Sequence, residues 1–200
     1  TEKIKNLMSC LKMSRKIGID LDGVVSDYQT YFLESLNERH KTHFKLEDWT
    51  EYNFTPIIRR HQFTKEDFWN LIKEHAEIGA WKYLSPIKGA IEGLKELKRQ
   101  GHYIHIITHK LEPAKADTIT WLSEHKIPYD SISFSDEKGK LCYLLGIDIM
   151  IEDSHKRAED LANYGIETLL LDQPWNRNIN LESPLIQKVK DWEEILEILK

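Results

Sequence analysis

The chain has 200 residues, with 28 Lys or Arg against 33 Asp or Glu and a net charge of -5. That length allows about 70% of the surface to be buried without disulfides, and the acidic balance argues against a nucleic acid polymer as partner. Two cysteines without a CxxC pair suit a reducing cytoplasm, and no run of about 18 apolar residues or signal-peptide pattern indicates a membrane. We expect a cytoplasmic protein of one domain with at most a modest insertion.

Residues 1–15 are rich in basic side chains with scattered apolar ones, and a strand pattern begins at about residue 16. We therefore expect a mobile extension before the folded core. Asp20 and Asp22 follow the apolar residues of this first strand, and Gly23 comes next. Residues i and i+2 of an extended backbone point to one side, so both carboxylates would converge at the strand end around a cation or a shared proton. An ordinary Asp-Gly turn is the structural alternative.

From residue 26 to about residue 83 the pattern is helical. Apolar residues recur at intervals of three and four after the Asp pair, and Thr64 with Asp67 three positions later predicts a capped helix start. We expect helices over residues 26–40, 46–52, 55–61 and 64–75. No segment here favours a strand, so residues 27–83 are predicted to form a small helical cap inserted after the first strand.

The predicted cap holds a large share of the aromatic residues of the chain. A small helical insertion needs bulky side chains for its own core, so most of them are expected to be structural, while one or two face a ligand. Our candidates for contact with a substrate are Tyr28, Phe32, Trp49 and Phe54.

Strands and helices alternate after the cap. We expect strands over residues 103–107, 131–134, 147–151 and 166–171, and helices over residues 86–100, 113–126, 140–145, 155–164 and 184–199. With the first strand this makes about five strands joined by helical crossovers, which predicts an α/β fold with a Rossmann-like parallel sheet and helices on both faces. The core would comprise residues 16–26 and 84–200.

Polar residues gather at the predicted strand ends, where open α/β sheets bind their ligands. Thr108 and His109 follow the second strand, Glu152 and Asp153 follow the fourth, and Lys138 or Lys140 begins the helix before the fourth. A hydroxyl, an ammonium and several carboxylates suit a phosphate and a Mg²⁺ ion. Each residue also has a structural alternative, such as a helix cap or a solvated surface position, but their shared placement favours a site.

This ordered set resembles the haloacid dehalogenase superfamily over residues 16–172. The resemblance implies that Asp20 is the nucleophile for a phosphoryl group and Asp22 the general acid and base. It implies that Thr108 binds phosphoryl oxygens and that Lys140, or as second choice Lys138, neutralises charge around Asp20. Mg²⁺ would be bound by Asp20, Asp153 and the main-chain carbonyl of Asp22.

A narrower resemblance, to the 5'(3')-deoxyribonucleotidase-like branch, rests on DLDGVV, IEDS and the segment 171–177. It implies a nucleotidase that releases phosphate from (deoxy)nucleoside monophosphates. Two further candidates for substrate contact follow from their positions: His109 is next to Thr108, and Arg177 lies in the loop after the last strand. That branch has Asp where this chain has Glu152, and a small residue in place of His109. Substrate selection is expected to come from the cap.

Other functions remain open at this stage. A phosphatase or phosphomutase for another small phosphate ester would use the same residues, and a receiver-like signalling domain also combines acids, Thr and Lys around Mg²⁺. The order of the motifs and the predicted cap argue against a receiver, and continuous phosphate release would separate an enzyme from it. The sequence does not exclude a homo-oligomer.

Overall fold

The computed structural model describes residues 14–60 and 63–200. Its centre is a parallel sheet of six strands in the order β3-β2-β1-β4-β5-β6. The strands are β1 (Lys16–Ile19), β2 (Tyr103–Thr108), β3 (Ser131–Phe134), β4 (Ile149–Glu152), β5 (Glu167–Leu171) and β6 (Ile186–Val189). The predicted α/β class is confirmed, with one strand more than expected.

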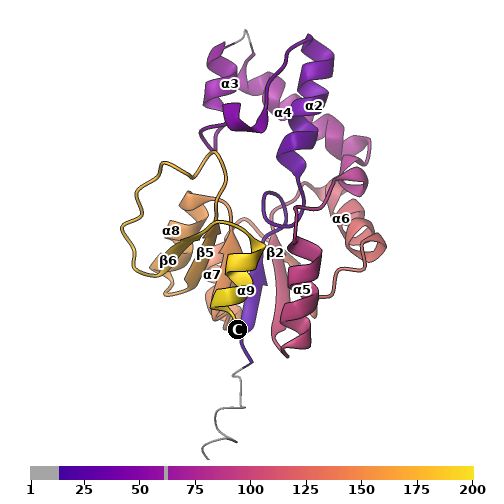
Figure 1. Cartoon of the computed structure of the whole chain (residues 1–200). Coiled ribbons are helices and arrows are strands. Elements are labelled where there is room, and N and C mark those ends of the chain that lie inside the picture. The colour runs from indigo at the N-terminus through magenta and orange to yellow at the C-terminus, as the bar shows by residue number, and fades with distance from the viewer. Residues whose placement is uncertain (1–13, 61–62) are drawn as a thin grey trace, which may run out of the picture.

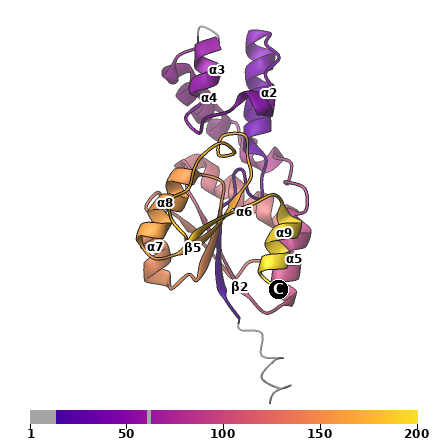
Figure 2. The same ribbon diagram turned by 60° about the vertical axis from the view of Figure 1, so that its left-hand side comes forward.

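Helices cover both faces of the sheet (Figure 2). On one face lie α5 (Ala90–Arg99) and α9 (Trp192–Ile198), and on the other lie α7 (Lys138–Leu145) and α8 (His155–Asn163). The remaining helix of the described core, α6 (Glu112–Glu124), packs beside residues Ala80–Tyr83, where the chain returns from the cap. Every residue of β4 is buried, as expected for a parallel strand covered on both sides.

The strand order determines where a ligand can bind. β1 lies between β2 and β4, and the direction of the crossovers reverses between β1 and β4. This is the doubly wound order, whose ligand site lies at the carboxyl ends of the two strands that flank the reversal. A receiver-type sheet has the order 2-1-3-4-5, so the observed topology excludes that alternative.

Residues 27–60 and 63–83, which we call the cap, stand above the carboxyl edge of the sheet (Figure 1). The cap contains α2 (Tyr28–His40), η1 (Leu46–Asp48), α3 (Thr55–Arg60), α4 (Lys65–Glu77) and η2 (Ala80–Tyr83). The predicted capping box of α4 is confirmed: the Asp67 N–H donates to the Thr64 hydroxyl (3.1 Å), and the Thr64 N–H donates to Asp67 Oδ2 (2.8 Å). Aromatic rings fill the interior, with Phe32 against Phe54 at 5.2 Å between ring centroids.

The two chain segments that join the cap to the core run side by side, and we call them the neck. The Asp27 N–H donates to the Ser85 carbonyl (2.9 Å), and the Ile87 N–H donates to the Val25 carbonyl (2.8 Å). Ser26 and Pro86 form an antiparallel bridge between these bonds. Because Pro86 belongs to the neck, α5 begins at Ala90 and not at Pro86 as predicted.

The prediction of one helix over residues 184–199 is wrong. Residues Ile186–Val189 instead form β6, which pairs with β5 at the edge of the sheet. Asp191 then starts α9, because its side chain accepts hydrogen bonds from the N–H groups of Glu193 and Glu194. The apolar side chains of the strand continued the spacing of the helix that follows, so the two elements resembled one.

The predicted extension lies almost entirely outside the described residues. The carbonyl of Arg15 accepts a hydrogen bond from the Tyr103 N–H (2.9 Å), so residue 15 already continues the pairing of β1. Within residues 14–60 and 63–200, none of the helices combines the length and the apolar character needed to cross a membrane.

Candidate active site

Three carboxylates meet where β1 and β4 end. Asp20 directly follows β1, and its N–H donates to the carbonyl of Ile151 in β4 (3.0 Å). Glu152 is the last residue of β4, and Asp153 follows it. Carboxylate oxygens of Asp20, Glu152 and Asp153 all lie within 4.8 Å of one another, and all three residues are buried. The structure thus brings Asp20 and Asp153 together as predicted.

The lysine beside Asp20 is Lys138, and the predicted placement of Lys140 there is wrong. Lys138 Nζ lies 2.8 Å from Asp20 Oδ2 and 2.8 Å from Glu152 Oε2. α7 begins two residues earlier than predicted, and residues i and i+2 of a helix point about 200° apart. Lys140 is therefore directed outward, where it is exposed and lies 3.6 Å from Glu137.

Burial and charge act in opposite directions on this cluster. Burial raises the pKa of Asp20, but the positive charges of Lys138 and then Lys110 lower it by more, so the net shift of this pKa is downward. Burial and the charge of Asp20 raise the pKa of Glu152, while burial and the charge of Glu152 raise that of Asp153. A second cation beside Lys138 would favour the ionised form of all three carboxyl groups.

The unpaired oxygens of the cluster test whether Mg²⁺ fits. Asp20 Oδ1 and Asp153 Oδ2 are buried without a hydrogen-bond partner in the described part of the chain. Glu152 is already engaged, because Lys138 donates to Oε2 and the Ser154 N–H donates to Oε1 (3.3 Å). Two free carboxylate oxygens are the hard ligands that Mg²⁺ prefers. Asp20 and Asp153 therefore fit a Mg²⁺ site, and Glu152 instead positions Lys138.

Gly23 and the loop after β5 position Asp153. A Cβ atom at Gly23, whose φ is +82°, would lie 2.2 Å from Asp153 Oδ2, so only glycine allows this approach. The side chains of Asn176 (2.8 Å) and Trp175 (3.2 Å) both donate to the main-chain carbonyl of Asp153. The loop that contributed to the nucleotidase resemblance thus supports the acidic cluster from behind.

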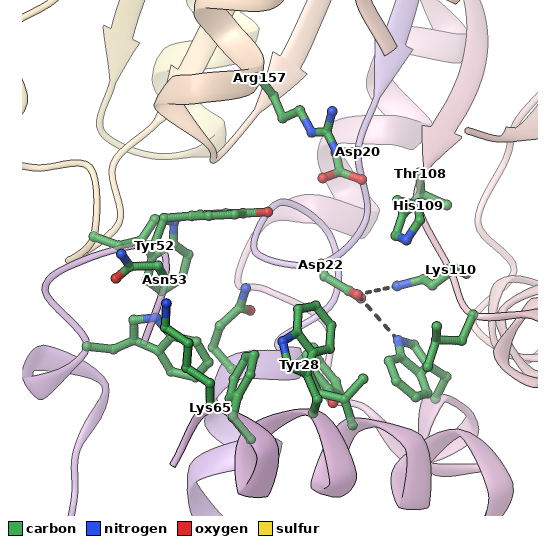
Figure 3. Close-up of a pocket in the computed structure, with 18 of the residues that line it drawn as sticks. Asp20, Asp22, Tyr28, Tyr52, Asn53, Lys65, Thr108, His109, Lys110 and Arg157 are labelled. Carbon is green, nitrogen blue, oxygen red and sulfur yellow. Dashed lines mark hydrogen bonds and ion pairs between the residues drawn. The ribbon is translucent and has the colours of Figure 1, made fainter. Parts of the chain in front are cut away.

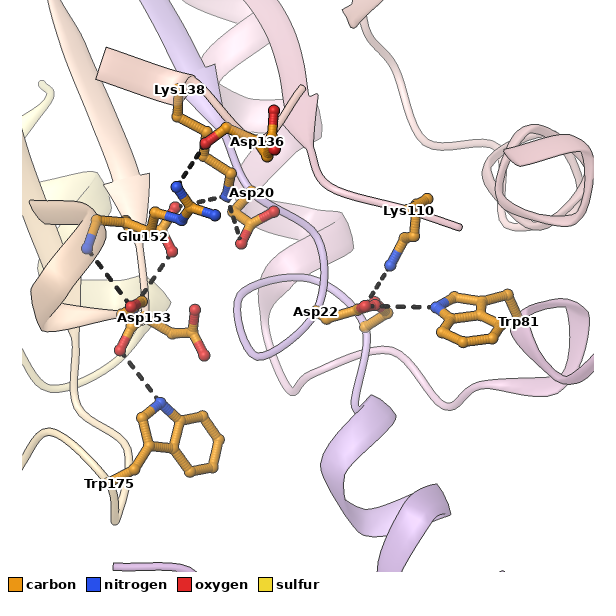
Figure 4. Close-up of polar contacts among 12 residues, drawn as sticks. Asp20, Asp22, Trp81, Lys110, Asp136, Lys138, Glu152, Asp153 and Trp175 are labelled. Atoms are coloured by element: carbon orange, nitrogen blue, oxygen red, sulfur yellow. Dashed lines mark hydrogen bonds and ion pairs between the residues drawn. The ribbon is translucent and has the colours of Figure 1, made fainter. Parts of the chain in front are cut away.

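Asp22 lies on the other side of the site, away from the acidic cluster (Figure 4). Its Oδ1 accepts a hydrogen bond from the Ser26 hydroxyl (2.9 Å), and its Oδ2 accepts from Trp81 Nε1 (3.3 Å) and Lys110 Nζ. Lys110 Nζ also lies 5.3 Å from the centroid of the Trp81 ring. The Asp22 carboxylate is therefore not directed at the predicted metal position, and only its main chain remains available for that role.

A cavity of about 450 Å³ lies between core and cap (Figure 3). The core contributes the following lining residues: Asp20, Asp22, Thr108, His109, Lys110, Leu111, Lys138, Arg157 and Trp175. The cap contributes Tyr28, Gln29, Trp49, Tyr52, Asn53, Ile58, Lys65, Phe68, Trp69, Ile72 and Trp81. One end of the cavity is thus charged, and the other is largely aromatic.

Some of the predicted substrate contacts lie in this cavity and others do not. Tyr28, Trp49 and His109 line it. Phe32 and Phe54 are buried in the interior of the cap, so the predicted contact of these two residues with substrate is wrong. Arg177 also lies outside the cavity, because its guanidinium pairs with Asp172 (2.8 Å) at the surface.

Sequence reasoning missed several residues that line the cavity. Lys110 stands two positions after Thr108, so its place at a strand end was a usable signal. Arg157 belongs to the first turn of α8, directly behind the acidic motif, and its guanidinium donates to the carbonyl of Asp136. Tyr52, Asn53 and Lys65 gave no such signal, because nothing in the cap sequence separates lining residues from packed ones.

The parallel sheet with its acidic cluster at the β1–β4 reversal and its inserted cap has the architecture of the haloacid dehalogenase superfamily. A solved structure of a dehalogenase has a similar fold, with a TM-score of 0.62 at 16% identity over 93% of this chain and 97% of that chain. The match at this identity concerns the fold alone.

Residues 14–200 match the family described as "5' nucleotidase, deoxy (Pyrimidine), cytosolic type C protein", and the chain belongs to this family. A Halalkalibacterium halodurans protein described as a "putative nucleotidase" is 29% identical over 92% of each chain. A Chlorobaculum tepidum protein described as a "putative 5'(3')-deoxyribonucleotidase" is 27% identical over 94% of this chain and 92% of the relative. The chain is accordingly a phosphoric monoester hydrolase.

Proposed function

We propose that this protein is a Mg²⁺-dependent nucleotidase that acts through an aspartyl-phosphate on Asp20. The observation that carries the proposal is the pair of buried, unpaired oxygens on Asp20 and Asp153 beside the ammonium of Lys138. Buried carboxylates without partners are costly unless a cation or a ligand completes them. Bound Mg²⁺ would supply positive charge that offsets the charge of the phosphoryl oxygens and of the nucleophile.

Asp20 supplies the nucleophile in the proposed reaction. A carboxylate oxygen of Asp20 forms a bond to phosphorus while the bond from phosphorus to the ester oxygen breaks. Lys138, which is buried against Asp20 and Glu152, reduces the repulsion between Asp20 and the anionic ester. Thr108 is buried at the end of β2 and lines the same end of the cavity, so its hydroxyl is placed to donate to a phosphoryl oxygen.

Asp22 moves the proton in the proposed reaction. It donates a proton to the departing ester oxygen, which leaves as an alcohol. Asp22 then accepts a proton from a water molecule whose oxygen attacks phosphorus, and the bond between phosphorus and Asp20 breaks to release phosphate. Asp22 lines the cavity together with Asp20 (Figure 3), where its carboxylate can act on the leaving oxygen.

The aromatic end of the cavity supports a nucleoside as leaving group. Stacking a base on an aromatic side chain contributes roughly 1 to 3 kcal/mol, and Trp49, Phe68 and Trp69 all line this end. The family description and the name of the Chlorobaculum tepidum relative support a deoxynucleotide, and the family description a pyrimidine. We expect nucleoside monophosphates to have a higher kcat/KM than sugar phosphates of similar charge.

Phosphate release from a panel of nucleotides and sugar phosphates, with Mg²⁺ and then with excess chelator, tests the proposal. Asp20→Asn should lower kcat by at least about 10⁴-fold, because the amide keeps the shape but loses the nucleophile. Asp172→Asn is the matched control, since Asp172 pairs with Arg177 outside the cavity. Turnover by Asp20→Asn at the wild-type rate would contradict the mechanism, and sugar phosphates as the better substrates would contradict only the nucleotidase assignment.

A further inference from the structure

A short turn in the cap is fixed at both ends by buried aromatic side chains. Trp49 and Phe54 are both buried, and their ring centroids lie 4.9 Å apart. Phe54 has a φ of +62°, and its N–H donates to the carbonyl of Glu51 (3.2 Å). A bulky residue rarely adopts a positive φ, and such strain persists only where the surroundings impose it. Residues 50–53 are therefore held at both ends by packed residues.

The same turn is anchored to the core beside the acidic cluster. The rings of Trp49 and Trp175 have centroids 6.1 Å apart, which joins the cap to the loop after β5. Trp175 Nε1 donates to the main-chain carbonyl of Asp153 (3.2 Å). Two aromatic side chains thus connect the turn to a residue of the proposed metal site.

Tyr52 stands at the tip of this turn and differs from its aromatic neighbours. Its side chain lines the cavity and remains 44% exposed, so it does not serve the interior of the cap. Its hydroxyl points across the cavity toward Asp20 (Figure 3). Among residues 14–60 and 63–200 this hydroxyl makes no hydrogen bond. Burial, followed by the charges of Asp153 and Glu152, raises its pKa, so the hydroxyl keeps its proton.

We propose that Tyr52 is a catalytic residue contributed by the cap, whose hydroxyl donates a hydrogen bond to an oxygen of the phosphoryl group bound at Asp20. This inference rests on the proposed function. The core supplies Lys138, carboxylates and the Thr108 hydroxyl to that position, while Tyr52 is a neutral donor that approaches from the cap. The phosphoryl end of the site is therefore complete only when the turn at residues 50–53 is docked on the core.

Tyr52→Phe tests the proposal, because it keeps the ring and removes only the hydroxyl. We expect kcat/KM to fall about 10 to 100-fold, the range for a lost hydrogen bond to a charged group. The loss should be equal for a nucleoside monophosphate and for p-nitrophenyl phosphate, since these esters share only the phosphoryl group. Inorganic phosphate should also bind the variant more weakly, as measured by calorimetry with Mg²⁺ present.

Tyr83→Phe is the matched control, because Tyr83 is an exposed cap tyrosine outside the cavity, and it should behave as wild type. A loss confined to the nucleotide would overturn the proposal by assigning Tyr52 to the leaving group, and so would wild-type phosphate affinity in Tyr52→Phe. If the wild-type chain released no phosphate from any ester, the proposed function would fail. The calorimetric comparison would still decide the role of Tyr52.

Discussion

Two buried lysines face two aspartates in this site, and their surroundings differ. Lys138 has a 3% exposed side chain and bridges Asp20 and Glu152 at 2.8 Å each. Lys110 has a 1% exposed side chain but pairs with the single carboxylate of Asp22, which is 22% exposed and also accepts from Trp81. The first cluster belongs to the core alone, whereas the second joins the core to the segment that returns from the cap.

The two clusters also differ in net charge. Around Lys138 the carboxylates outnumber the cation, so the cluster has a negative excess that a metal can offset. Around Lys110 one cation meets one carboxylate, and the aromatic face of Trp81 covers the ammonium. We infer that the first cluster attracts Mg²⁺, while the second is satisfied by the chain itself.

Lys138→Met should have the largest effect on stability. Removal of the ammonium leaves Asp20 and Glu152 buried against each other, and breaking a buried pair in this way costs about 3 to 5 kcal/mol. Urea unfolding in the presence of chelator should show this loss, and added Mg²⁺ should restore part of it. Lys140→Met is the control and should change the free energy of unfolding by less than about 0.5 kcal/mol. Equal effects of the two substitutions would contradict the placement of Lys138.

Lys110→Met should cost less, about 1 to 3 kcal/mol, because Asp22 is partly exposed and keeps the Ser26 and Trp81 donors. The same unfolding experiment measures it, and here added Mg²⁺ should restore nothing. Lys190→Met, at an exposed position directly after β6, serves as the control. If Mg²⁺ restored the stability of Lys110→Met, the inferred difference between the two clusters would be wrong.

His75 should make the stability of the cap sensitive to acid. We expect its effect on the free energy of unfolding to be smaller than those of Lys138→Met and Lys110→Met. It is buried behind Tyr28, whose hydroxyl lies 3.2 Å from its Nδ1, and burial lowers its pKa to about 4. The unfolded chain binds this proton near pH 6.5, so the stability that His75 contributes is present above pH 6.5 and is lost as the pH falls toward 4.

Between pH 7 and pH 5 we expect the wild-type chain to lose on the order of 1 kcal/mol more stability than His75→Gln. Urea unfolding at each pH measures the difference. His43→Gln, at an exposed position of the cap, should keep the wild-type dependence. A wild-type dependence in His75→Gln as well would show that other groups set the response to acid.

The core half of the site could be predicted from the sequence because strand ends are regular. Asp20, Thr108 and Asp153 each directly follow a strand or end one, and parallel strands bring such positions to one edge. The active-site lysine could not be chosen in the same way, since Lys138 and Lys140 both lie near the start of α7. A shift of two residues in a helix start reverses the direction of a side chain, and sequence patterns do not determine helix ends that closely.

The cap half could not be predicted because packing and ligand contact use the same residue types there. Trp49 and Phe54 are both buried aromatics, yet only Trp49 also lines the cavity. Whether a cap side chain faces the cavity or the cap interior depends on how the cap helices pack against one another, and the cap has no sheet whose regular geometry would determine this. The edge strand β6 was missed for a related reason, since Ile186 and Val189 continue the apolar spacing of α9.

The neck between cap and core is built from main-chain hydrogen bonds at Asp27 and Ile87. Bonds of this kind depend on the backbone and hardly on which side chains the residues carry. The path of the chain at the neck therefore tolerates a change of side chain at these positions. The aspartates below do not share this freedom, because Trp81 of the cap donates to Asp22, and Trp49 packs against Trp175, whose Nε1 donates to the carbonyl of Asp153.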